Sequence, residues 1–144
     1  MAGSSSVNRP SLFSRSSSSS VVLLLRAEGL AIAAISALLY ARTGASWWLF
    51  VALWLAPDLS MLGYLRGSCS GARIYNAVHT YAGPAVLALW ALTLSARMLL
   101  PISLIWINHI GVDRLLGYGL KYSDGFGWTH LGRLGKPREV TQPE

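Results

Sequence analysis

Five acidic or histidine side chains lie inside mainly apolar stretches of the sequence: Glu28, Asp58, His79, His109 and Asp113. Charge in a hydrocarbon environment is costly unless it is paired or faces a polar interior, so these residues need an explanation that surface charges do not. Imidazole and carboxylate groups bind zinc and similar divalent ions, and in membranes they also form proton relays. Any function of this protein is therefore to be sought at these positions.

Helical spacing groups histidine with aspartate. His109 and Asp113 are four residues apart, so they share one helix face and can bind one ion together, while Gly117 lets a neighbouring helix approach closely. Asp58 follows Pro57, whose kink can turn the carboxylate inward. The candidate metal ligands are His79, His109, Asp113 and Asp58, and the candidate catalytic acids or bases are Glu28, Asp58 and Asp113.

A second polar stripe consists of Asn76, His79, Thr80 and Gly83, which recur at helical spacings of three, four and seven residues. If this stripe faces the one formed by His109, Asp113 and Gly117, the two stripes together would form a polar cavity open toward one side of the membrane. The expected members of a polar network around the site are Asn76, Asn108 and Thr80.

The elements that must position these residues are four apolar segments, at about residues 21–41, 46–65, 74–96 and 98–120. Each has roughly the 20 residues that a helix needs to cross a hydrocarbon core. Backbone groups in lipid must be hydrogen-bonded within the segment, which excludes an open sheet. The sequence therefore predicts an all-α, polytopic membrane protein, with a bundle of four transmembrane helices over residues 21–122.

Depth within the membrane is shared by the ionisable residues. Counted from the inner boundary of each segment, all five lie about 8 to 16 Å deep at about 1.5 Å per residue. The outer halves of the segments contain no ionisable group. We therefore predict a single polar layer in the inner half of the bundle.

Composition supports the membrane prediction. The chain is 53% hydrophobic and 12% charged, and 12 Lys and Arg against 6 Asp and Glu give a net charge of +6. Most basic residues lie between and beyond the apolar segments, where they orient a protein in a bilayer, so we expect a lipid bilayer as partner and no nucleic acid. No phosphate-binding glycine loop precedes a helix, so no nucleotide cofactor is expected. The sequence leaves a homo-oligomer open.

Charge asymmetry predicts the orientation. Eight Lys and Arg lie on one side and two on the other, which places both termini in the cytoplasm or the equivalent compartment, at the plasma membrane or an organelle inner membrane.

Residues 1–20, rich in Ser and free of acidic residues, are typical of a disordered tail or of a transit peptide. Residues 123–144 form a polar tail, in which residues 127–132 either anchor at the interface, the interpretation we favour, or fold back as a lid over the cavity.

Three functional interpretations remain. The polar layer is a structural network that fixes helix register, a metal site that hydrolyses a lipid-like substrate with Glu28 or Asp58 as general base, or the site of a small proton-coupled transporter. The residue pattern does not decide whether the protein is an enzyme.

Four motifs in order resemble a small family of integral membrane proteins, the domain of unknown function 4260. The resemblance covers about residues 25–135, and its motifs are APDLSMLGY at 56–64, YNAVHTY at 75–81, WINHIGVDR at 106–114, and GYGLKY at 117–122 with THLG at 129–132. It implies a compact multi-pass membrane protein and no particular activity, substrate or cofactor. The Ser-rich extension of residues 1–20 departs from the family pattern.

Overall fold

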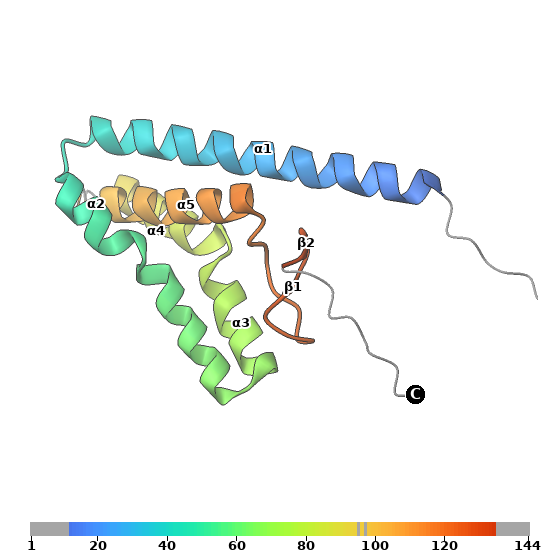
Figure 1. Ribbon diagram of the computed structural model, residues 1–144. Helices are drawn as coiled ribbons and strands as arrows, with labels where there is room; N and C mark the ends of the chain where they lie inside the picture. Colours follow the sequence, from blue (N-terminus) through green and yellow to red (C-terminus); the bar gives the residue numbers. More distant parts are fainter. Residues whose placement is uncertain (1–11, 95, 97, 135–144) are drawn as a thin grey trace, which may run out of the picture.

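The longest two helices of the fold lie side by side. The computed structural model describes residues 12–94, 96 and 98–134, and Figure 1 shows α1 (Leu12–Arg42) running along α5 (Leu99–Leu116). The shorter helix α4 (Ala82–Thr93) packs against α5 as well. Helix α5 is therefore the centre of the fold, and eight of its residues are buried.

Small residues let α1 and α5 approach closely. A Cβ atom on Gly29 would come within 2.8 Å of the carbonyl oxygen of Gly111, and one on Gly111 would come within 2.9 Å of the Ala33 nitrogen. Close backbone approach at small residues is a common way for helices to associate in membranes. The hydrophobic effect contributes little to helix association there, because lipid chains are as apolar as the side chains.

The second predicted segment forms an α-helix followed by a 3-10 helix. It consists of α2 (Trp47–Trp54), with Ser46 as its N-cap, and the 3-10 helix η1 (Ala56–Arg66). Pro57 lies at the start of η1, where its missing N–H costs no hydrogen bond. Eleven residues are long for a 3-10 helix, and such stretches mark hinges or strained sequences.

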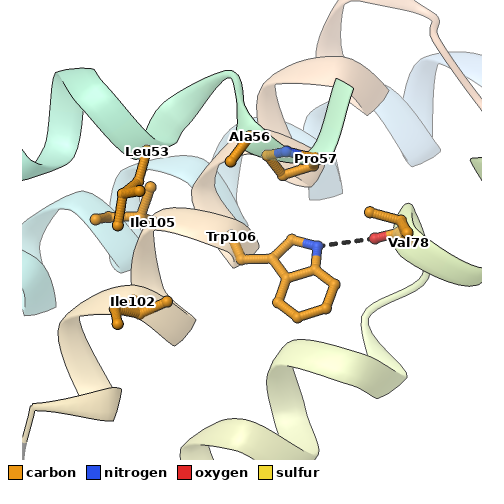
Figure 2. A pocket seen from close by; sticks show the side chains of 7 residues that line it. All are labelled: Leu53, Ala56, Pro57, Val78, Ile102, Ile105 and Trp106. Atoms are coloured by element: carbon orange, nitrogen blue, oxygen red, sulfur yellow. Dashed lines mark hydrogen bonds between the residues drawn. The ribbon is translucent and has the colours of Figure 1, made fainter. Parts of the chain in front are cut away.

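The third predicted segment differs from our expectation of one helix over residues 74–96. The chain forms α3 (Ser68–Val78) and α4, separated by residues 79–81. Pro84 lies in the first turn of α4, a position that suits the start of a new helix, and the indole Nε1 of Trp106 donates to the Val78 carbonyl at 2.8 Å (Figure 2). Helix α3 packs against η1, and in Figure 1 these two helices diverge from α1 and α5.

Both predicted tails are partly structured. Helix α1 begins at Leu12, inside the segment expected to be disordered; no Pro or Gly interrupts residues 12–20, so a helix formed further on can extend through them. After α5, the chain folds into a short hairpin of β1 (Trp128–Thr129) and β2 (Gly132–Arg133). Residues 1–11 and 135–144 of the predicted tails lie outside the described residues.

Within the described part of the chain, three helical stretches are long and apolar enough to cross a membrane: Ser19–Arg42, Trp47–Arg66 and Leu99–Leu116. The broken third segment is not among them, because α3 and α4 individually extend only about 16 and 18 Å at about 1.5 Å per residue. The protein is thus mostly helical, and three of its helical stretches have membrane-spanning length.

Candidate metal centre

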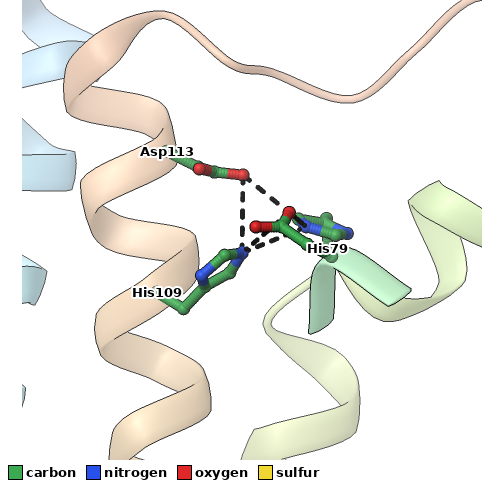
Figure 3. A group of neighbouring side chains, drawn as sticks. His79, His109 and Asp113 are labelled. Atoms are coloured by element: carbon green, nitrogen blue, oxygen red, sulfur yellow. Dashed lines mark hydrogen bonds and ion pairs between the residues drawn. The ribbon is translucent and has the colours of Figure 1, made fainter. Parts of the chain in front are cut away.

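Two histidines and two aspartates converge between α5, η1 and the end of α3. One ligand atom from each of Asp58, His79, His109 and Asp113 lies within 4.8 Å of the other three. Figure 3 shows the side chains of His79, His109 and Asp113 turned toward one point. The structure therefore brings together all four residues that we predicted as metal ligands.

Each ligand comes from a position that the local backbone determines. His109 and Asp113 are one turn apart on α5, as their spacing predicts. His79 is the residue at which α3 ends, so the break in the third segment directs its imidazole toward α5. Asp58 lies in the first turn of η1, directly after Pro57.

Five of the six distances between the ligand atoms match the edges of a tetrahedron around a metal ion, and the sixth, between the two carboxylate oxygens, is within 4.8 Å. The Nε2 atoms of His79 and His109 are 3.2 Å apart, and each lies 3.5 Å from Asp58 Oδ1. Asp113 Oδ2 lies 3.6 Å from His79 Nε2 and 3.7 Å from His109 Nε2. Ligand bonds of about 2.1 Å in a tetrahedral zinc site put neighbouring ligand atoms about 3.4 Å apart.

Hydrogen bonding orients the His79 ring for this role. Its Nδ1 lies 3.0 Å from the backbone carbonyl of Tyr75, which can only accept, so Nδ1 carries the hydrogen and Nε2 of the neutral ring presents a lone pair to the cluster. Carboxylate oxygens are also acceptors when ionised. His79 and the two carboxylates therefore direct electron pairs at the centre of the cluster, where a cation, or the hydrogen on His109 Nε2, stabilises them.

Exposure differs among the four residues. The side chains of His109 and His79 are 1% and 3% exposed, that of Asp113 is 15% exposed and that of Asp58 is 30% exposed. Solvent and small molecules therefore reach the cluster mainly past Asp58.

Tyr75 supports two of the ligands, and our sequence interpretation missed it. Its hydroxyl donates to Asp113 Oδ2 at 3.1 Å, and its ring stacks on the His79 ring with centroids 3.7 Å apart. Groups that hold ligands in this way commonly change metal affinity by about 10- to 100-fold. Its position four residues before His79, on the same helix face, was the available signal.

Asn108 supports the cluster from the side facing α1. Its amide donates to the Ala33 carbonyl at 2.8 Å, and its oxygen accepts from the Trp54 indole at 2.9 Å. The Trp54 ring packs edge-on against the His109 ring, with centroids 5.1 Å apart. Asn108 thus acts on the site through Trp54.

Three other predicted residues lie outside the cluster. Glu28 is exposed on α1, and it is not among the converging residues. The side chain of Thr80 accepts from the Ala82 nitrogen at the start of α4. Asn76 pairs with the backbone of Lys121: its amide donates to the Lys121 carbonyl at 2.9 Å, and its oxygen accepts from the Lys121 nitrogen at 2.7 Å.

Lys121 places a buried ammonium group beside the site. The residue is 3% exposed, its Nζ finds no hydrogen-bond acceptor among the described residues, and it lies over the rings of Phe126 at 4.1 Å and Tyr75 at 5.1 Å. Burial lowers the pKa of Lys121, and the nearby carboxylate of Asp113 opposes that shift. The sequence interpretation counted this residue only as an orientation signal.

Residues 117–134 fold back against the end of α5 and against α3. The Leu120 nitrogen donates to His130 Nδ1 at 2.8 Å, and the Arg114 guanidinium lies 3.5 Å from Nε2 of the same ring. Burial, followed by the charge of Arg114, lowers the pKa of His130. The neutral form of His130 therefore holds residues 117–134 in place through its hydrogen bond with Leu120.

This histidine makes the carboxyl-terminal segment sensitive to acid. Because the pKa of His130 is lower in the folded protein than in the unfolded chain, its contribution to stability is present above about pH 6.5 and is lost as the pH falls through the folded value. Protonated Nδ1 can no longer accept from Leu120. We expect amide hydrogen exchange of residues 117–134, corrected for intrinsic rates, to accelerate between about pH 7.5 and about pH 5.5 in the wild type. In His130→Gln the corrected rates should be nearly independent of pH, and equal pH dependence in both proteins would contradict this role.

Fold and site together define a mostly helical protein that has three helices of membrane-spanning length and a buried histidine–aspartate cluster. The chain belongs to the family described as Domain of unknown function (DUF4260), whose model matches residues 22–134. This confirms the resemblance seen in the sequence motifs. No curated protein and no solved structure matches the chain.

Proposed function

We propose that the chain is a membrane-embedded, metal-dependent hydrolase that acts on lipid-like esters. The observation that carries the proposal is the near-tetrahedral convergence of Asp58, His79, His109 and Asp113. Imidazole and carboxylate ligands of this kind suit zinc or a similar divalent ion. A divalent ion also lowers the pKa of a bound water enough to make it a nucleophile near neutral pH.

The four residues then have two roles. His79, His109 and Asp113 are the more buried and hold the ion, since catalytic zinc sites commonly have three protein ligands and an open fourth position. Asp58 is the most exposed and comes from a different element, so it serves as general base. In the reaction, water gives a proton to Asp58 and its oxygen bonds to the ester carbonyl carbon. The ester C–O bond then breaks, and the leaving alkoxide takes the proton from Asp58.

Four membrane crossings belong to the same proposal. The crossings are α1, α2 continued by η1, α3 with α4, and α5, with both termini on the cytoplasmic side. The contact between the Arg26 guanidinium and the Leu116 carbonyl, at 3.2 Å, supports placing the amino-terminal half of α1 and the end of α5 on one side. The excess of basic residues there supports assigning that side to the cytoplasm.

The Asp58→Asn variant tests the division of roles. We expect it to retain one divalent ion per chain, measured by elemental analysis after purification in mild detergent and dialysis. It should lose at least about 100-fold in hydrolysis of a fluorogenic long-chain ester, because general-base catalysis is commonly worth about 10²–10⁴-fold. A wild-type protein without stoichiometric metal would refute the metal site. Unchanged hydrolysis in Asp58→Asn would refute the role of the base.

A further inference from the structure

An apolar groove lies beside the cluster. Its volume is about 240 Å³, and it is formed by side chains of α2, η1, α5 and the end of α3 (Figure 2). Its wall includes Ala56, Pro57, Val78, Ile105 and Trp106.

Three residues of the groove are close in the chain to residues of the cluster. Pro57 and Val78 directly precede Asp58 and His79 in the chain, so two groove residues are each bonded to a cluster residue. On α5, Ile105 is four residues before His109 and lies on the same helix face. The four cluster residues do not line the groove themselves, but the groove is built from residues bonded to two of them and from the helix that carries the other two.

The lining can bind only an apolar group. The seven side chains offer one hydrogen-bond donor, the Trp106 indole, and it is already bonded to the Val78 carbonyl at 2.8 Å. A polar group placed in such a groove would lose its hydrogen bonds to water without replacement.

We propose that this groove binds the hydrocarbon chain of a lipid ester, with the ester group at the cluster. The inference rests on the proposed hydrolase and names the part of the substrate that the site recognises. The lining residues from α2, η1 and α5 belong to stretches of membrane-spanning length, so the groove opens to a medium of lipid chains. A chain can enter sideways from the bilayer, and the adjoining carboxylate of Asp58 then faces the polar ester group.

Filling the groove tests this proposal. Ala56→Phe adds a ring to the lining, while Ala52→Phe adds the same ring to an exposed position of α2 and serves as the matched control. The probe is a phospholipid brominated along its acyl chain, in nanodiscs. Quenching of Trp106 is obtained by subtracting the signal of the corresponding Trp106→Phe protein. We expect Ala56→Phe to lose at least half of this quenching and Ala52→Phe to lose none.

Metal content, measured on the same samples, separates the two proposals. Normal metal with reduced quenching and reduced long-chain hydrolysis in Ala56→Phe supports both. Reduced quenching in a protein that binds no metal supports the chain site and refutes the hydrolase. Unchanged quenching in Ala56→Phe overturns the chain site. If Ala56→Phe does not fold, Ile102→Phe fills the groove from α5 and gives the same comparison.

Discussion

The His109→Ala variant is expected to lose its stoichiometric divalent metal entirely. The His109 side chain is 1% exposed, and its Nε2 lies within 3.7 Å of ligand atoms from the other three residues, so it is a central member of the cluster. Loss of a ligand leaves two protein donors for a three-ligand site, which is too few for tight binding. Elemental analysis and equilibrium dialysis with a competing chelator measure the loss.

Glu28→Gln is the matched control for this prediction. Glu28 lies at a similar predicted depth but is exposed on α1, so the change removes a carboxylate without touching the cluster. We expect normal metal content in Glu28→Gln. Asp113→Asn, which preserves side-chain size, should bind metal more weakly than the wild type. Equal metal content in His109→Ala and Glu28→Gln would rule out the cluster as the metal site, and loss of stability alone in His109→Ala and Asp113→Asn would favour a structural network.

Gly111→Leu is expected to separate α1 from α5. Any Cβ at position 111 would lie 2.9 Å from the Ala33 nitrogen and from the Gly29 carbonyl oxygen, and backbone atoms within a helix cannot move aside. Overpacking of this kind costs about 3 kcal/mol of unfolding free energy. The variant should also bind metal poorly, because α5 carries two of the ligands.

Reversible unfolding in mixed detergent micelles measures this cost. The control is Ala34→Leu, which adds the same side chain at an exposed position of α1 and should change the unfolding free energy by less than about 0.5 kcal/mol. If Gly111→Leu is as stable as Ala34→Leu, then the two helices do not pack at this glycine.

Spacing along a helix predicted part of the site well. His109 and Asp113 face the same way because four residues make about one turn, and this holds wherever the helix is placed. Pro57 also directed attention to Asp58, and the 3-10 helix after it does turn the carboxylate toward the histidines. Local geometry was sufficient in both cases.

Depth alone could not identify the members of the cluster. Glu28 and Asp58 have similar predicted depths, but depth measures position along the helix axis and not rotation about it. Helix α1 directs Gly29 toward α5 and leaves Glu28 exposed, a result of packing against a helix that comes much later in the chain. The rotation of a helix depends on such tertiary contacts.

The helix break at His79 also could not be predicted from the sequence. The apolar pattern continues through the third segment, so hydropathy predicts one helix. The structure instead has two helix ends there, separated by residues 79–81, and Trp106 stabilises the first of them through the Val78 carbonyl. The same break aims His79 at α5, so this irregularity serves the candidate site.

The pairing of Asn76 with Lys121 has a consequence for how the protein is made. Asn76 is synthesised with the third segment, whereas residue 121 leaves the ribosome last among the parts of the site. Until then the Asn76 amide lacks both of its backbone partners, and Tyr75 lacks the cationic group that covers it. The surroundings of the centre are therefore completed only on chains whose synthesis has passed Lys121, so a chain that ends before this residue lacks both the partners of Asn76 and the cation over Tyr75.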